Sequence, residues 1–157
     1  MENKGLVIVH TGDGKGKTTA ALGMALRAWG NHMRVLILQF IKGSWDYGEL
    51  KAIKALSSAD ACIEIRQGGF GFSQRGAGKE EEHRRAALDL LHKAMNELRS
   101  NAWDMVILDE FNYAYSFGFI QSGDLENLLS IRPEGTHLIL TGRNAPQKLI
   151  DRADLVT

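Results

Sequence analysis

The chain has 157 residues, of which 44% are hydrophobic and 24% charged, and its 19 basic residues balance 19 acidic ones. This size and composition predict one globular domain over residues 1–157, and the zero net charge gives no support for broad capture of nucleic acid. The single cysteine excludes an intramolecular disulfide and a four-cysteine zinc site. Because no apolar run reaches membrane-spanning length and the start, MENKGLVIV, lacks the apolar core of a signal peptide, we expect a cytoplasmic protein without a membrane span.

Short apolar runs alternate along the chain with segments of helical spacing. The runs rich in Val, Ile and Leu cover residues 6–10, 33–41, 61–66, 103–108 and 136–140. Their continuous apolar character favours strands that are buried on both faces, as in a parallel sheet between helices.

Three segments between these runs carry apolar residues at helical spacing. The first is predicted to end near Gly30, and the second, which is longer, to start near Lys79. The predicted buried faces are Leu22, Leu26 and Trp29 in the first segment, Ala87, Leu91, Ala94, Met95 and Leu98 in the second, and Leu125, Leu128 and Leu129 in the third. The alternation predicts βαβ units and a three-layer α/β fold, with a mostly parallel central sheet and helices on both faces. In such sheets ligands bind beyond the carboxyl ends of the strands.

The stretch HTGDGKGKTTAA, residues 10–21, follows the first apolar run and precedes the first helix. The phosphate-loop pattern G-x-x-x-x-G-K-[ST] is met at Gly16, Lys17 and Thr18, but Thr11 stands where the first glycine is expected, and Gly12 follows one residue late. Glycines let successive N–H groups point into one concavity, and the helix start adds positive potential there. The other interpretation is a glycine-rich turn that only starts a helix.

We therefore predict a P-loop NTPase-like fold with a nucleotide site in this loop. Lys17 would neutralise phosphate oxygens, and the Thr18 hydroxyl would reach a Mg²⁺ ion. The predicted binding residues of the loop are Thr11, Gly12, Asp13, Gly14, Lys15, Gly16, Lys17, Thr18 and Thr19.

Polar residues also follow two later apolar runs. WDMVILDE ends on Asp109 and Glu110, and a carboxylate at the end of a buried strand opposite a phosphate loop is where a Mg²⁺ partner is expected. One of the two acids should contact the metal directly or through water. An acid pair in this position can also cap a helix. LILTGRNAP places Arg143 after another strand, where it could contact phosphate or cap the next helix.

These residues together resemble the P-loop type of ATP:corrinoid adenosyltransferases. The segments that carry the resemblance are QFIKGSWDYGE at 39–49, GGFGFS at 68–73, LDEFNYAYSFGFI at 108–120 and RPEGTHLILTGRNAPQKLIDRADLVT at 132–157. The resemblance covers about residues 5–157. It implies that cobalt(I) of a corrinoid attacks the 5′ carbon of ATP, that a carbon–cobalt bond forms and that inorganic triphosphate leaves, in adenosylcobalamin synthesis or salvage.

The resemblance also implies roles for particular residues. Lys17, Glu110 and Phe72 would be catalytic, with Glu110 as a metal-contacting acid and Phe72 displacing the lower axial ligand of the corrinoid. Trp45 and Phe70 would face the corrinoid. Family members commonly carry a second aromatic residue two places after the position of Phe72, where this chain has Gln74.

The same resemblance implies ATP and Mg²⁺ or Mn²⁺, a corrinoid substrate, an electron-donating flavoprotein or other reductant, and a homodimer. The residues by themselves leave two other functions open. One is a conventional P-loop ATPase or kinase in which Glu110 orients water and the products are ADP and phosphate. The other is a non-catalytic carrier of a corrinoid or nucleotide.

Overall fold

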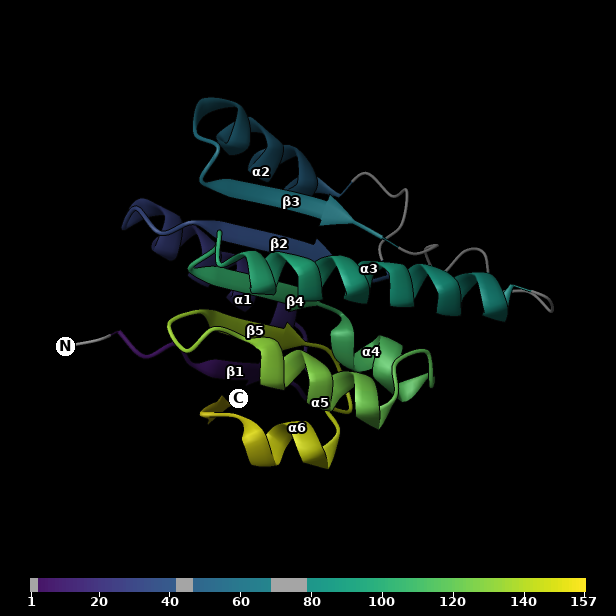
Figure 1. Cartoon of the computed structure of the whole chain (residues 1–157). Coiled ribbons are helices and arrows are strands. Elements are labelled where there is room, and N and C mark those ends of the chain that lie inside the picture. Colours follow the sequence, from purple (N-terminus) through teal and green to yellow (C-terminus); the bar gives the residue numbers. More distant parts are fainter. Residues whose placement is uncertain (1–2, 42–46, 69–78) are drawn as a thin grey trace.

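The computed structural model describes residues 3–41, 47–68 and 79–157 and is built around one central sheet (Figure 1). Within these residues the sheet has six strands in the order β3-β2-β4-β5-β1-β6, and every pair of neighbours is parallel. The strands are β1 (Val7–His10), β2 (Val35–Gln39), β3 (Ile63–Gln67), β4 (Met105–Asp109), β5 (His137–Thr141) and β6 (Leu155–Val156). The five apolar runs thus form five neighbouring strands, as predicted.

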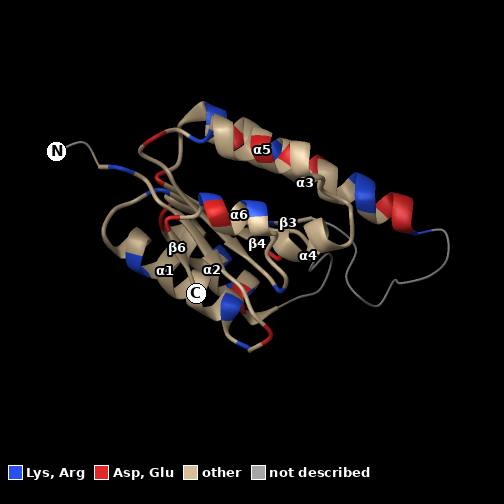
Figure 2. Ribbon diagram, turned by 90° about the horizontal axis from the view of Figure 1, so that it is seen from below, with Lys and Arg blue, Asp and Glu red and all other residues tan. Residues whose placement is uncertain are grey.

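Helices cover both faces of this sheet (Figure 1). They are α1 (Lys17–Gly30), α2 (Gly48–Ala59), α3 (Glu80–Ser100), α4 (Phe111–Ser116), α5 (Ser122–Ile131) and α6 (Gln147–Arg152). One apolar cluster joins the sheet to α1 and α2, and a second joins its other face to α3, α4, α5 and Leu149 of α6. The predicted three-layer α/β fold is confirmed. Acidic and basic residues alternate along α3 (Figure 2). No described helix has the length and hydropathy needed to cross a membrane.

The buried faces predicted for α3 and α5 are confirmed, and the one predicted for α1 is confirmed only in part, because Leu22 and Trp29 pack against the core but Leu26 does not. The buried residues of α1 are Ala21, Ala25 and Ala28, whereas Leu26 is 47% exposed and Trp29 is only partly buried. The helix packs across β1, β2, β4 and β5, and a row of short alanine side chains lets its backbone approach the sheet closely. The spacing of the large apolar residues therefore found the edge of the buried face, with Leu22 and Trp29, but missed its alanine centre and wrongly included Leu26.

Helices α2, α4 and α6 and strand β6 were not predicted from the sequence. α4 and α6 have six residues each and β6 has two, so they are too short to show a periodic pattern. α2 buries only Leu50 and Ile53. These elements owe their formation to packing against the sheet rather than to local pattern.

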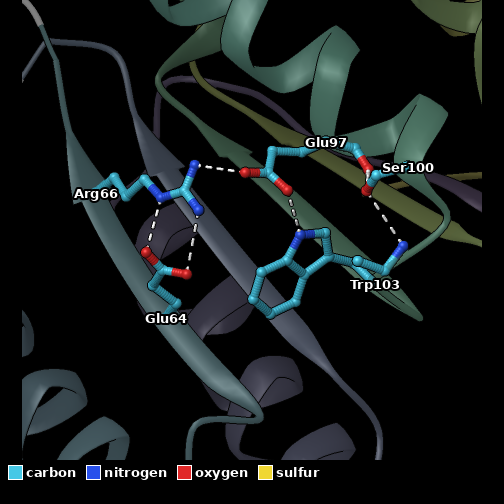
Figure 3. A network of polar contacts seen from close by, with 6 residues as sticks. Glu64, Arg66, Glu97, Ser100 and Trp103 are labelled. Atoms are coloured by element: carbon cyan, nitrogen blue, oxygen red, sulfur yellow. Dashed lines mark hydrogen bonds and ion pairs between the residues drawn. The ribbon is translucent and has the colours of Figure 1, made fainter.

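A polar network ties the edge strand β3 to α3 (Figure 3). The Arg66 guanidinium donates to both carboxylate oxygens of Glu64 at 2.8 and 3.1 Å, and to Glu97 of α3 at 2.7 Å. The Glu97 carboxylate also accepts a hydrogen bond from the Trp103 indole at 2.8 Å. This bond, together with the one from Arg66, lowers the pKa of Glu97. The network holds the end of β3, from which the chain continues towards Gly68, against the rest of the sheet.

The alanine face of α1 predicts a large effect for one substitution and a small effect for its neighbour. Ala25→Leu should lower the free energy of unfolding by about 1–3 kcal/mol, because the added atoms have no room between helix and sheet. Leu26→Ala is the matched control and should change it by less than about 0.5 kcal/mol, because Leu26 is 47% exposed. Urea unfolding followed by circular dichroism measures both; a larger loss for Leu26→Ala would contradict this packing.

Candidate active site

The phosphate-loop sequence forms the turn between the end of β1 and the start of α1. Gly12 and Gly16 have φ angles of 102° and 106°, a backbone region that residues other than glycine avoid. Gly16 is also the N-cap of α1. Thr11 holds the entrance of this turn: its N–H donates to the Thr157 carbonyl at 2.8 Å, and its hydroxyl accepts from the Ala145 N–H at 3.1 Å. The threonine at the first-glycine position thus joins the loop to the segments after β5 and β6.

A pocket of about 500 Å³ opens beside this loop. The described residues that line it are Gly14, Lys15, Gly16, Lys17, Thr18 and Thr19 from the loop and the start of α1, Glu110 and Tyr113 from the region after β4, and Arg143 from the region after β5. The structure therefore gathers the second half of the predicted loop set with Glu110 and Arg143. Thr11, Gly12 and Asp13 lie in the first half of the loop, outside the lining.

The pocket combines cationic side chains with the backbone of the loop. Lys15, Lys17 and Arg143 line it against a single described carboxylate, that of Glu110. The Lys17 ammonium donates to the Gly14 carbonyl, so it lies across the loop. Cations and N–H groups around a helix N-terminus favour a ligand with several negative charges. The chain has zero net charge, so this positive potential is a property of the pocket.

Asp109 lies directly behind the pocket, at the end of β4, and is 1% exposed. Its Oδ1 accepts hydrogen bonds from the hydroxyls of Thr18 at 2.8 Å and Thr141 at 2.7 Å, and its Oδ2 accepts from the Gln39 side-chain amide at 3.2 Å. These donors stabilise a carboxylate that burial alone would disfavour. The Thr18 hydroxyl uses its only hydrogen in the bond to Asp109, so the lone pairs of the Thr18 oxygen remain available for a cation.

Glu110 occupies the N-cap position of α4, with a φ of 62°, but its side chain makes no capping hydrogen bond. Its backbone N–H donates to the Thr141 hydroxyl at 3.0 Å, and its side chain lines the pocket. Among the described residues no group of three or more His, Cys, Asp and Glu side chains could hold a metal by itself. A hydroxyl and a carboxylate at the edge of an anion pocket are oxygen donors that suit Mg²⁺ when phosphate oxygens complete its coordination.

Several residues of this site were not predicted from the sequence. Tyr113 lines the pocket three residues after Glu110, and its ring stacks on that of Phe117 with centroids 4.3 Å apart. Gln39 and Thr141 end strands β2 and β5 and hold Asp109. Their only signal was a polar residue at the end of an apolar run. Trp45, Phe70 and Phe72 lie outside the described residues.

His10 ends β1, in register with Thr141 of β5, and is 7% exposed. Among the described residues its Nε2 atom has no hydrogen-bond partner. Burial lowers the pKa of this imidazole from its ordinary value of 6.5, because the charged form would lose its solvation. Burial therefore favours the neutral form of His10 in the folded protein.

A parallel sheet that ends in a glycine-rich loop before a helix, with a buried aspartate opposite it, defines a P-loop nucleotide-binding α/β protein. The flagellar accessory protein FlaH from Methanocaldococcus jannaschii has the same fold: its crystal structure matches with a TM-score of 0.61 at 12% identity, over 98% of this chain and 70% of that one. The family is narrower. The chain belongs to the ATP:corrinoid adenosyltransferases, because the family model described as ATP:corrinoid adenosyltransferase BtuR/CobO/CobP matches residues 3–157.

Individual relatives agree with this family. A corrinoid adenosyltransferase of Escherichia coli K12 is 33% identical over 157 residues, which are 100% of this chain and 77% of the relative. One from Sinorhizobium sp. is 37% identical over 158 residues, which cover 99% of this chain and 72% of the relative. The protein is thus an enzyme with corrinoid adenosyltransferase activity.

The buried imidazole predicts a pH dependence of stability. The folded-state pKa of His10 lies below 6.5, so on acidification the unfolded chain takes up a proton before the folded chain does. The free energy of unfolding should therefore fall as the pH drops below about 6.5 and level off below the folded-state pKa. Urea unfolding at a series of pH values between 7.5 and 5 measures the slope.

Two variants isolate this contribution. His10→Phe should flatten the slope in that range, because it removes the group that titrates differently in the two states. His92→Phe replaces an exposed histidine of α3 and should keep the slope of the natural protein. Equal slopes for the natural protein and His10→Phe would contradict the neutral, buried state of His10.

Proposed function

We propose that the protein transfers the 5′-deoxyadenosyl group of ATP to cobalt(I) of a corrinoid and releases inorganic triphosphate, in adenosylcobalamin synthesis or salvage. The observation that carries the proposal is the pocket in which Lys15, Lys17 and Arg143 surround a loop of backbone N–H groups. It is supported by the membership of residues 3–157 in the ATP:corrinoid adenosyltransferase family.

The chemistry of this transfer suits the residues of the pocket. The cobalt(I) of the substrate donates an electron pair to the 5′ carbon, the carbon–oxygen bond breaks, and its electron pair leaves with the triphosphate. Because the nucleophile belongs to the corrinoid, the protein needs no nucleophile or general base of its own. Its task is to align the two substrates and to neutralise the charge of the leaving group. Lys15, Lys17, Arg143 and the loop N–H groups would hold the phosphates, with the 5′ carbon directed away from the loop towards the corrinoid.

A divalent cation, Mg²⁺ or Mn²⁺, fits the oxygen donors beside the loop. Thr18 and Glu110 would hold it, and Asp109 would act through the Thr18 hydroxyl, to which it is hydrogen-bonded at 2.8 Å. When bound, the ion would add positive charge next to the departing triphosphate. The residues of the predicted metal set thus divide into two that face the pocket and one that is buried behind it.

The corrinoid side of the proposal rests on the sequence segments 39–49 and 68–73. Trp45 and Phe70 would contact the corrinoid, and Phe72 would displace its lower axial ligand, which leaves a four-coordinate cobalt(II) that is easier to reduce. An electron-donating flavoprotein or another reductant would supply the electron, and the protein would act as a homodimer.

An anaerobic assay with ATP, Mg²⁺ and a chemically reduced corrinoid tests the reaction. We expect a light-sensitive adenosylcorrinoid and intact triphosphate in equal amounts. ADP and phosphate as products would indicate a conventional ATPase and contradict the proposal. Binding of both substrates without any product would contradict it in favour of a carrier.

Lys17→Ala should lower kcat/KM in this assay by about 100-fold or more, because it removes a cation that stabilises charge developing on the leaving group. The matched control is Lys54→Ala on the exposed side of α2, which removes the same charge away from the pocket and should keep the activity of the natural protein. A Lys17→Ala variant with unchanged activity would exclude the proposed role of this lysine.

Phe72→Ala separates the two stages of the reaction. If Phe72 acts by displacing the axial ligand, the variant should transfer the adenosyl group to pre-reduced cobalt(I) at nearly the natural rate. With cobalt(II) and a reductant supplied to the protein, the rate should fall at least tenfold. Equal losses by both routes would show that Phe72 serves corrinoid binding instead.

A further inference from the structure

A row of polar side chains crosses the sheet at the carboxyl ends of its strands. Gln39 of β2 is in register with Gln67 of β3 on one side and with Asp109 of β4 on the other. Paired residues of parallel strands direct their side chains to the same face of the sheet. The three side chains therefore lie next to one another on the face that α1 covers, as the contact between Asp109 and Thr18 of α1 requires.

These side chains form a continuous chain of hydrogen bonds. The Gln67 amide nitrogen donates to the Gln39 carbonyl oxygen at 3.0 Å, and the Gln39 amide nitrogen donates to Oδ2 of Asp109 at 3.2 Å. Gln39 is fully buried and Asp109 is 1% exposed. Neither glutamine is among the described residues that line the pocket, and the hydrogen bond from Gln39 to Asp109 links them to it.

The charge of Asp109 sets the direction of the whole chain. A carboxylate can only accept hydrogen bonds, so Gln39 must turn its NH₂ group towards Asp109 and its carbonyl towards β3. That carbonyl is buried and needs a donor, which the NH₂ group of Gln67 supplies. The orientation of both amides thus follows from the hydrogen bond that Gln39 donates to Asp109.

The same chain restricts the rotation of the Asp109 carboxylate. Gln39 holds Oδ2, while the hydroxyls of Thr18 and Thr141 hold Oδ1. With both oxygens engaged from opposite sides, the carboxylate keeps Oδ1 towards Thr18. The backbone supports this arrangement. The Gly68 N–H donates to the backbone carbonyl of Gln39 at 2.9 Å, and the Phe40 N–H donates to the backbone carbonyl of Asp109 at 3.0 Å.

We propose that Gln39 and Gln67 are positioning residues of the nucleotide and metal site. Gln67 orients Gln39, and Gln39 fixes the plane of the Asp109 carboxylate. Asp109 then accepts the hydrogen bond of the Thr18 hydroxyl, which leaves the lone pairs of the Thr18 oxygen for Mg²⁺. This inference rests on the proposed function, since it assumes a cation at Thr18. It assigns a role to two residues of the strand ends that do not touch the pocket themselves.

The sharpest test is Gln67→Glu, which keeps the shape of the side chain but removes its donor. A carboxylate at position 67 cannot donate to the Gln39 carbonyl. The side-chain carbonyl of Gln39 would then face that carboxylate, which places two acceptors together. If the Gln39 amide rotates by 180° instead, its carbonyl faces the carboxylate of Asp109. Gln67→Leu only removes the donor and leaves Gln39 oriented by Asp109, so its effect should be smaller.

Calorimetric titration with ATP at pH 8, with and without Mg²⁺, measures the effect independently of catalysis. We expect the factor by which Mg²⁺ tightens ATP binding to fall about tenfold in Gln67→Glu and two- to fivefold in Gln67→Leu. Binding of ATP without Mg²⁺ should stay within about twofold of the natural protein in both. A general loosening of the sheet would instead weaken ATP binding with and without Mg²⁺ alike.

Asn127→Asp is the control for the added negative charge, because Asn127 is exposed on α5, on the other face of the sheet. It should leave the Mg²⁺ effect unchanged. An unchanged Mg²⁺ effect in both Gln67 variants overturns the inference. If Gln67→Glu does not fold, Gln67→Leu decides alone: a two- to fivefold loss supports the inference, and no loss overturns it.

The outcome for the inference can be distinguished from that for the proposed function. Suppose that the natural protein makes no adenosylcorrinoid, but that Mg²⁺ tightens its binding of ATP and does so much less in the Gln67→Glu variant. The proposed function then fails, and the positioning role stands. If the natural protein makes the product and the Gln67 variants keep the Mg²⁺ effect, only the positioning role fails. ATP binding by the natural protein that does not depend on Mg²⁺ overturns both the metal assignment and the inference.

Discussion

The structure depends on one buried charge, the carboxylate of Asp109 at the end of a central strand. A charge that is 1% exposed is stable only if hydrogen bonds replace its lost hydration, and here the donors are Thr18, Thr141 and Gln39. Their elements, α1, β5 and β2, must therefore all be in place before the site can exist. The alanine face of α1 serves the same end, because it lets the helix come close enough for Thr18 to reach the aspartate.

Strand order explains how a chain with zero net charge gathers three cationic side chains in one pocket. Lys15 and Lys17 come from the turn after β1, and Arg143 from the region after β5. β1 and β5 are adjacent in the sheet, although their paired residues are about 130 positions apart in the chain. The positive potential is thus local and produced by strand order. It accords with a function in which a leaving group of high charge is held and no residue of the protein acts as nucleophile.

Much of the fold and the centre of the site could be predicted from the sequence because their signals are local. Buried strands are short runs of Val, Ile and Leu, and the phosphate loop is a contiguous stretch in which Gly16, Lys17 and Thr18 stand at set positions. The same pattern was only partly right for α1, where Leu22 and Trp29 pack against the core, Leu26 is exposed and the fully buried residues are alanines. Which side of a helix is buried depends on how close its partner lies, and a sequence pattern does not contain that distance.

The sequence by itself determined the five strands of the sheet core, the phosphate loop, the acids after β4 and the family to which these motifs belong, since each is a feature of contiguous residues. Only the tertiary structure decided that Gln39 and Thr141 donate hydrogen bonds to Asp109, that Tyr113 lines the pocket and that burial lowers the pKa of His10. The bond from Gln39 to Asp109 joins residues 70 positions apart. Such contacts follow from strand order and register, which arise when the whole sheet assembles and not from any one segment of the chain.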